Sequence, residues 1–245
     1  MYDRRLRRSV NKAILSVRHP QYAEALKALG YQIIPTDIIS CDMPYERDHA
    51  DLQCLILDDT AFVLSECKGL IKALSDSYHV VICDEHFSGR YPNNVCLNAI
   101  QLKNKLICRI LSLDEKVKEY CQKHGYGLIN VKQGYAKCSC AVVSDHAIIT
   151  ADNGIIRSLE DNPIDVLSIG KRSIRLDGAD TGFIGGASGY DKDRKTLYFC
   201  GNIKEHPDYN SIKYNSIKRF CNEQDTQIVS LNDDHLTDIG GIIFC

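Results

Sequence analysis

The residues with the most chemistry to offer are two cysteines and a histidine beside an acid. A cysteine thiolate is a nucleophile, so Cys245, which ends the apolar run GGIIFC, and Cys138, which follows Lys137, are candidates. His49 and Asp51 stand two residues apart, which on a strand would place them on one face as an oriented acid/base pair. The structural alternatives are a core thiol for Cys138, since Lys137 would take the polar strand face, and an ordinary surface contact for His49.

The composition is that of a globular protein. The chain has 245 residues, of which 44% are hydrophobic and 25% are charged, enough for one large or two small domains with a substantial core. Its formal net charge is -2 and the charges are interspersed, so we expect neither nucleic acid nor an anionic membrane as a partner. The arginine-rich residues 2–8 are interpreted as a solvated N-terminal arm.

Neither a membrane span nor a secretion signal is evident in the sequence. No apolar stretch approaches the roughly 20 residues that cross a bilayer, and no signal-peptide core follows the charged N-terminus. We therefore expect a cytoplasmic protein. In that reducing compartment the 12 cysteines, which lie inside apolar runs such as VVIC and LYFC, are expected to be reduced core thiols.

Two patterns that would indicate a metal or a nucleotide are incomplete. Cys138 and Cys140 form a CxC pair, but no second pair stands at zinc-ligand spacing, so we expect no metal site. The glycine-rich stretch DTGFIGGASGYD has neither of the usual phosphate-loop spacings, and a strand hairpin is expected after it in place of a helix. The sequence therefore predicts no nucleotide-binding fold and no cofactor.

Internal repeats organise the chain. Four successive segments each predict strand, strand, helix, strand, with short β-branched strands and helices that carry apolar residues at i, i+3 and i+4. The letters that carry this pattern are QCLIL, AFVL, GLIKAL and VVIC in the first segment; VCLNAIQL, KLICRI, LDEKVKEYCQKHG and GLINV in the second; CSCAVV, AIIT, GIIRSLE and DVLSI in the third; and GFIGGASG, TLYFC, PDYNSIKYNSIKRFCNE and QIVSL in the fourth.

The two ends of the chain supply a fifth unit. Residues 12–35 predict a strand, a helix and a strand, and the tail GGIIFC supplies the first strand that this unit lacks. Joining them would remove the edges that an open array exposes. Gly30 and Gly125, each between a helix and the next strand, are expected in the left-handed conformation that ends a helix. We predict a single α/β domain over residues 1–245, with units at 12–48 plus 239–245, 49–90, 91–133, 134–180 and 181–238.

Five strand-strand-helix-strand units in a ring, closed by the C-terminal strand, resemble the pentein superfamily, the guanidine-modifying fold. Its members include arginine and agmatine deiminases, dimethylarginine dimethylaminohydrolases, amidinotransferases and the non-catalytic eukaryotic ribosomal anti-association factor. The resemblance covers nearly the whole chain as a pattern and implies a pentein-type α/β propeller around a central channel. It also implies that the starts of the units face this channel, where the enzymes have their active sites.

The resemblance implies several site residues. In agmatine deiminases the nucleophilic cysteine stands four positions after the last glycine of a glycine run, and Gly241 and Cys245 have that spacing. The segment LDDTAFV resembles the acidic segment of dimethylarginine hydrolases, which implies Asp58 and Asp59 as the carboxylates that pair with a planar guanidinium. The alternative is that Asp58 and Asp59 form an ordinary hairpin turn. The starts of the units add further ligand-binding candidates, Asn94, Lys137, Asp180 and Asp238.

Two features depart from the pentein hydrolases. Those enzymes carry their acid/base histidine at the start of the fourth unit, where this sequence has Ala136 and Lys137, and His146 falls farther along in a predicted hairpin turn. Cys245 is also the last residue of the sequence, and a terminal carboxylate beside its thiol would raise the pKa of that thiol and weaken it as a nucleophile.

We therefore expect, first, a pentein-fold protein whose polar channel binds a small polar or cationic, guanidino-like ligand without the full residue set of the enzymes. One alternative is an active amidine or guanidine hydrolase, or an amidinotransferase, with Cys245 or Cys138 as the nucleophile and His49 as a displaced acid/base. The other alternative is a non-catalytic pentein that binds a macromolecular partner through its outer surface. The sequence predicts no particular oligomeric state.

Overall fold

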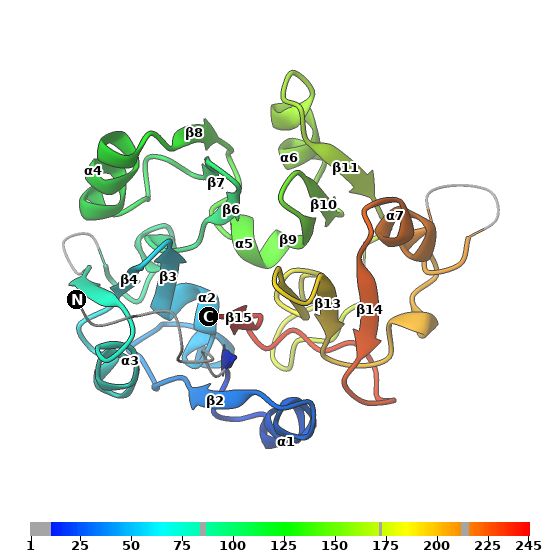
Figure 1. Ribbon diagram of the computed structural model, residues 1–245, viewed down its shortest axis with the longest axis horizontal. Helices are drawn as coiled ribbons and strands as arrows, with labels where there is room; N and C mark the ends of the chain where they lie inside the picture. Colours follow the sequence, from blue (N-terminus) through cyan, green and yellow to red (C-terminus); the bar gives the residue numbers. More distant parts are fainter. Residues whose placement is uncertain (1–10, 84–86, 172, 212–215) are drawn as a thin grey trace, which may run out of the picture.

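Five small sheets surround a common axis in the computed structural model, which describes residues 11–83, 87–171, 173–211 and 216–245 (Figure 1). Every sheet has the same topology: the first strand is antiparallel to the middle strand, and the third strand is parallel to it. A helix connects the middle strand with the third strand each time, because parallel neighbours need a crossover connection.

The predicted order of strand, strand, helix and strand is confirmed. The strands are, sheet by sheet, β15 (Ile243–Phe244), β1 (Lys12–Leu15) and β2 (Gln32–Pro35); β3 (Cys54–Leu57), β4 (Thr60–Val63) and β5 (His79–Ile82); β6 (Ile100–Leu102), β7 (Lys105–Cys108) and β8 (Gly127–Asn130); β9 (Cys140–Ser144), β10 (Ala147–Thr150) and β11 (Asp165–Ser168); β12 (Ser188–Asp191), β13 (Thr196–Phe199) and β14 (Gln227–Ser230). The crossover helices are α1 (Pro20–Ala28), α3 (Lys68–Leu74), α4 (Glu115–His124), α6 (Asn153–Leu159) and α7 (Ile217–Glu223).

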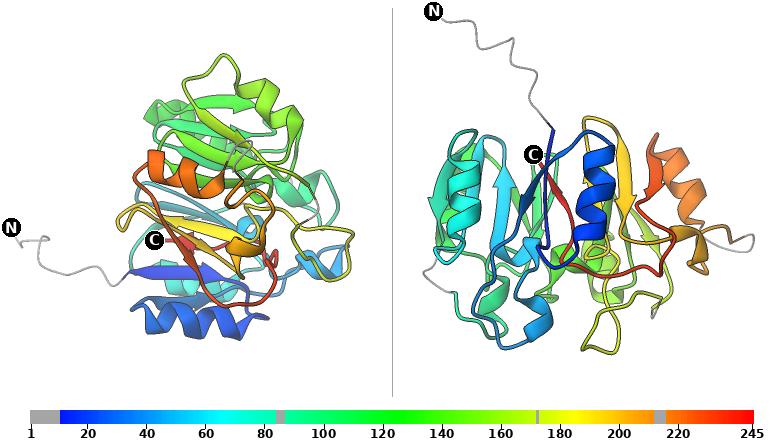
Figure 2. Two further views of the ribbon diagram at one scale, coloured as in Figure 1. Left: turned by 90° about the vertical axis from the view of Figure 1, so that its right-hand side faces the viewer. Right: turned by 90° about the horizontal axis from the view of Figure 1, so that it is seen from below.

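The crossover helices lie on the outside of the ring, and the sheets lie between them and the axis (Figures 1 and 2). All four residues of β4, of β10 and of β13 are buried, because helices cover these middle strands from outside and neighbouring sheets cover them from inside. This burial on both faces explains why the middle strands read as unbroken apolar runs in the sequence.

The C-terminal strand closes the ring, as predicted. β15 runs antiparallel to β1, with Phe244 opposite Ala13 and Ile243 opposite Ile14. The backbone amide of Lys12 donates to the carbonyl of Cys245 at 2.9 Å, and the amide of Cys245 donates back at 3.0 Å. The last residues of the chain therefore lie at the centre of the molecule, beside the first described strand (Figure 1).

Glycine ends two of the crossover segments in the way the sequence predicts. Gly30 has a φ of 89° and Gly125 a φ of 74°, the left-handed region that residues with a Cβ avoid. At the N-termini of two helices, Asp114 caps α4 by accepting from the amide of Lys116, and Asp152 caps α6 by accepting from two amides of its first turn. Local sequence therefore sets the ends of these helices.

The starts of the units differ from the prediction. Short helical turns occupy three of them, namely α2 (Ala50–Gln53), η2 (Asn93–Val95) and α5 (Ala136–Ser139), and another turn, η1 (Pro44–Glu46), ends the first unit. The strands begin later, so β6 takes only the end of VCLNAIQL and β12 only the end of GFIGGASG. One further turn, η3 (Ile203–Glu205), follows β13. The inner turns matter because they carry the polar side chains nearest the axis.

The described cysteines form no disulfide with one another and lie almost entirely in the core, with only Cys245 partly exposed. Helices long and apolar enough to cross a membrane are absent from the part of the chain that the structure describes.

Candidate functional site

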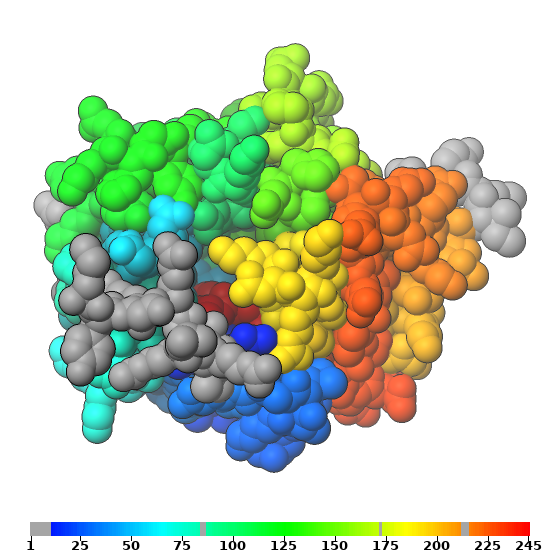
Figure 3. Space-filling model, in the orientation of Figure 1, coloured from blue at the N-terminus to red at the C-terminus, as the bar shows by residue number. Residues whose placement is uncertain are grey.

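A hollow of about 770 Å³ lies at the axis, and side chains from all five sheets line it. The turns of four hairpins contribute Asp58, Lys103, Asp145 and Lys192. Figure 3 shows the C-terminal residues in dark red at the centre of this face, next to the yellow segment that holds β12 and β13. The hollow is therefore the central channel that the sequence predicts.

The polar side chains contributed by the short inner helices are Asp51 from α2 and Lys137 from α5. The expectation that His49 and Asp51 share a strand face is wrong, because the chain turns into α2 at Ala50. The expectation that Lys137 and Cys138 lie on opposite faces of a strand is wrong for the same reason, since β9 begins only at Cys140. A helical turn brings the Asp51 carboxylate and the Cys138 thiol together, whereas a strand would hold Cys138 in a separate layer.

Asp51 is the buried acid of the site, with 2% of its surface exposed. The thiol of Cys138 donates to its Oδ2 at 2.9 Å, and the amide of Asn98 donates to the Cys138 sulfur at 3.1 Å. The other carboxylate oxygen of Asp51, Oδ1, is buried without a hydrogen-bond partner among the described residues. A buried carboxylate oxygen normally accepts a hydrogen bond, so this atom identifies an unfilled acceptor position.

Burial perturbs both members of this pair. Desolvation raises the pKa of Asp51 to about 6, against a smaller opposite effect of the His49 and Lys137 charges. Desolvation, followed by the nearby Asp51 charge, raises the pKa of the Cys138 thiol well above its usual value. Cys138 is therefore a neutral hydrogen-bond donor to Asp51 at neutral pH, and this arrangement disfavours it as a nucleophile.

Lys137 is the half-buried lysine on the inner helix α5, and a hydrogen bond of its backbone amide positions it. Its amide donates to the side-chain oxygen of Asn98 at 2.7 Å, while its Nζ donates to the carbonyl of Gly185 at 3.5 Å. The ammonium group makes no ion pair with another residue of the described ranges at a separation of 4.0 Å or less. It therefore keeps donor capacity for a ligand in the hollow.

Cys245 lines the same hollow and is half-buried. Desolvation raises the pKa of its thiol to about 11, even though the charge of Lys12 and a hydrogen bond with Tyr78 act in the opposite direction. The sequence-based expectation of a weak thiolate agrees with this direction, but the main cause is burial, not the terminal carboxylate.

Asp58 also lines the hollow, in the turn between β3 and β4, whereas Asp59 is not among the lining residues. Asp58 has a φ of 53°, and its two carboxylate oxygens accept hydrogen bonds from Tyr126 at 3.0 Å and Tyr120 at 3.1 Å. The turn alternative thus describes the backbone, while the Asp58 carboxylate is held in place by two phenols at the channel wall.

The remaining predicted residues lie outside the lining of the hollow. His49 is buried and packs directly against Gly240. Asn94 is buried and donates to Glu46 at 2.9 Å and to Tyr135 at 3.0 Å.

The two other predicted carboxylates, Asp180 and Asp238, have different environments. Asp238 is buried and accepts from the backbone amides of Phe183 at 2.9 Å and Gly240 at 3.0 Å. It therefore orders the loop before β15, and it does not line the hollow. Asp180 is exposed on a loop and does not line it either. The structure thus brings Cys245, Asp51, Lys137 and Asp58 together and leaves these two outside.

Sequence reasoning missed Asn98 and the channel-wall aromatics Tyr78 and Tyr126. Asn98 connects the site, since it contacts the Cys138 sulfur, the Lys137 amide and the carbonyl of Asp51. An available signal was its position as a polar residue inside the apolar run VCLNAIQL. The tyrosines follow helices in ordinary amphipathic patterns, which carry no sign of a channel position.

Solved structures with the same architecture define the class of this fold. Dimethylarginine dimethylaminohydrolase from Pseudomonas aeruginosa, in complex with citrulline, superposes with a TM-score of 0.56 at 9% identity, over 96% of this chain and 98% of that one. A dimethylarginine dimethylaminohydrolase adduct with S-methyl-L-thiocitrulline gives 0.56 at 8% identity, over 90% and 91% of the two chains. An adduct of the enzyme with 4-chloro-2-hydroxymethylpyridine gives 0.52 at 8% identity, over 89% and 91%. The protein has the pentein fold, as predicted.

At this identity the likeness shows the fold alone. Within that class, the chain belongs to the family of unknown function DUF6873, whose model matches residues 14–243. No curated protein matches the sequence.

Proposed function

We propose that the central channel binds a small ligand through a cationic guanidinium or ammonium group that donates to Asp51. The observation that carries the proposal is the Oδ1 atom of Asp51, which lacks a partner among the described residues and belongs to a side chain lining the hollow. A buried carboxylate is stable when a charged donor completes its hydrogen bonds. A planar N–H donor entering from the channel would supply that bond.

Lys137 supports the second half of the recognition. Lys137 lines the same hollow as Asp51, and among the described residues its ammonium group makes a single hydrogen bond, a long one of 3.5 Å. A ligand with an acceptor or negative group beside its cation would satisfy both side chains, so it should bind more tightly than a simple cation such as agmatine, which pairs with Asp51 alone. The proposed ligand is therefore a polar molecule with both kinds of group.

Binding without turnover is favoured over cysteine chemistry. The Cys138 thiol donates a hydrogen bond to the Asp51 carboxylate, and burial raises the pKa of the Cys245 thiol to about 11. Neither cysteine is therefore an activated thiolate at neutral pH. The described histidine that lines the hollow is His124, and its ring stacks on Tyr120 with centroids 4.0 Å apart. The alternative of an amidine hydrolase or amidinotransferase still has a thiol in the channel, Cys245, and it deserves a direct experiment.

Alkylation of Cys245 by iodoacetamide is expected to be slow at pH 7 and to accelerate about tenfold per pH unit up to pH 9, because only the thiolate reacts. Peptide mapping of the labelled protein measures the rate at this position, and the variant Cys245→Ser identifies the peptide. A rate that is already maximal near pH 7, together with ammonia release from a guanidino compound, would contradict the binding proposal in favour of the hydrolase.

A thermal-shift titration tests the proposed function. Agmatine, arginine and guanidinium are the probes, and a ligand present at 100 times its Kd should stabilise the folded protein by about 2.7 kcal/mol. The variant Asp51→Asn should show no shift with the same probes. The proposal fails if no probe raises the Tm of the unmodified protein, or if Asp51→Asn responds equally. If the unmodified protein and the Asp51→Asn variant captured the same macromolecular partner equally well, the surface-binding alternative would be favoured.

A further inference from the structure

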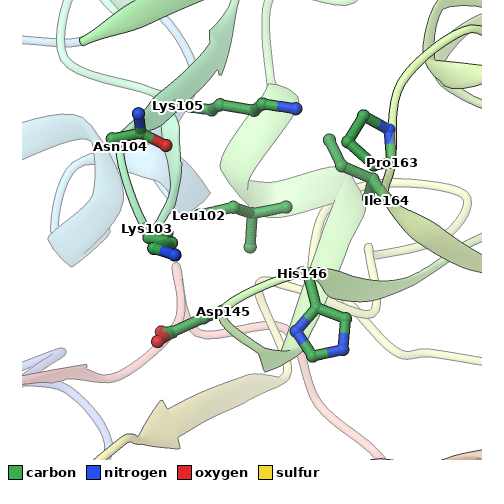
Figure 4. Close-up of a pocket in the computed structure, with 8 residues that line it drawn as sticks. All are labelled: Leu102, Lys103, Asn104, Lys105, Asp145, His146, Pro163 and Ile164. Carbon is green, nitrogen blue, oxygen red and sulfur yellow. The ribbon is translucent and has the colours of Figure 1, made fainter. Parts of the chain in front are cut away.

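A second hollow, of about 470 Å³, lies between the β6–β7 hairpin and the segments around β9 and β11 (Figure 4). Lys103 and Lys105 stand on one side of it, and Asp145 and His146 stand on the other. Leu102 is buried at its base. We call this hollow the side groove.

The side groove adjoins the central channel. Lys103, Asn104 and Asp145 line both hollows, so the two share a common wall and a common edge. A ligand that fills the channel would therefore meet these three residues, and a longer ligand would continue past them. The channel alone already lies in the upper part of the range of about 300–1,000 Å³ that holds drug-sized ligands.

The charges of the side groove are mainly positive. Neither Lys103 nor Lys105 forms an ion pair with any residue in the described ranges, and Asp145 is the one carboxylate among the lining residues. The buried side chains of Leu102 and Ile164 add apolar surface to the lining of the groove (Figure 4). Two ammonium groups that form no ion pair with the described residues, together with these apolar side chains, suit an anionic group carried on a short apolar chain.

We propose that the ligand of the channel extends into the side groove and presents a carboxylate or phosphate group to Lys103 and Lys105. This inference rests on the proposed function, because it takes the cationic end of the ligand to lie at Asp51. The ligand class is therefore a two-ended molecule, with a guanidinium or ammonium head, a short linker and an anionic tail.

Matched peptides test the tail separately from the head. The probes are peptide amides with an N-terminal arginine, zero to three alanines and a final glutamate, each paired with a version that ends in glutamine and one that ends in phosphoserine. Titration calorimetry at two salt concentrations measures their affinities for the protein. At one linker length, the glutamate or phosphoserine peptide should bind about three- to tenfold more tightly than the glutamine peptide, and salt should reduce this difference.

The variant Lys105→Ala, which changes a lysine that lines the side groove but not the channel, should reduce that difference while it leaves the affinity for agmatine unchanged. The variant Lys204→Ala, which removes one exposed lysine outside both hollows, is the matched control and should retain the difference. If the comparison of glutamate with phosphoserine shows a preference, it identifies the anionic group.

The outcomes separate the two proposals. If agmatine binds through Asp51 but the peptides ending in glutamate, phosphoserine and glutamine bind equally at every linker length, the side-groove inference is overturned and the channel proposal stands. If neither agmatine nor any peptide binds, both proposals fall. If the lysine control loses the preference as well, the effect is general surface charge and the side groove is excluded.

Discussion

The variant Asp51→Asn is expected to raise the stability of the protein while it abolishes the response to guanidinium ligands. Asp51 is buried, and desolvation raises its pKa from 3.8 to about 6. At pH 7 the folded protein must hold this carboxyl ionised, which by the usual conversion costs about 3 kcal/mol relative to an ordinary aspartate. Asparagine has the same shape, keeps an oxygen to accept from Cys138, and carries no charge.

The pH dependence of this difference provides a sharper measurement. The folded protein binds the Asp51 proton more tightly than the unfolded chain, so protonated Asp51 contributes stability that is complete below about pH 3.8 and is lost as the pH rises through about 6. The stability advantage of Asp51→Asn should therefore be small at pH 4, grow between pH 4 and 6, and stay constant above that. Urea unfolding of both proteins at several pH values measures it.

A second buried aspartate serves as the control. Asp48 is as deeply buried as Asp51, but Arg18 lies 3.3 Å from its Oδ1 and Ser16 donates to its Oδ2. Removing the charge of a paired acid weakens its ion pair and its hydrogen bonds, so Asp48→Asn should lower the free energy of unfolding. Equal stabilisation by both variants would show that the loss of any negative charge stabilises the protein, and it would contradict a specific destabilisation by the buried charge of Asp51.

The variant Gly240→Ala is expected to destabilise the protein by about 3 kcal/mol or more, equivalent to a fall in Tm of roughly 6–12 °C. Gly240 has a φ of 75°, and a Cβ there would lie 2.3 Å from the Cα of His49. Backbone atoms cannot move aside as a flexible side chain can. The carbonyl of Gly240 also accepts from the amide of Asp51, so the displacement would reach the proposed ligand site.

Gly125→Ala is the matched control for this prediction. Gly125 has nearly the same φ, 74°, but a Cβ there meets nothing within 4 Å. Only the backbone strain remains, and the expected cost is about 1 kcal/mol. Thermal unfolding of the two variants would separate backbone strain from steric overlap. Equal falls in Tm would contradict the close approach between the loop that precedes β15 and the start of α2.

Much of the fold could be predicted from the sequence because it rests on local patterns. Short apolar strands, amphipathic helices and glycine at helix ends repeat along the chain, and each reports a property of a few neighbouring residues. The pairing of the C-terminal strand with β1 could also be predicted, because a unit without a first strand and a strand without a unit complete one another. Asp51 was a candidate because it stands two residues from His49, whereas the resemblance to the pentein enzymes implied Lys137, Asp58 and Cys245.

The tertiary structure alone decided what these candidates do. Asp51, Asn98 and Cys138 are far apart in the sequence, and their hydrogen bonds exist only because short helical turns bring three units to the axis. The raised pKa values of Asp51 and Cys245 follow from burial, which no local pattern reports. The sequence by itself determined the repeated elements and the strand that closes the ring, since these depend on neighbours along the chain. The unpartnered acceptor at Asp51, and the wall that the channel shares with the side groove, are formed by residues that are distant in the sequence. Only tertiary packing brings those residues together.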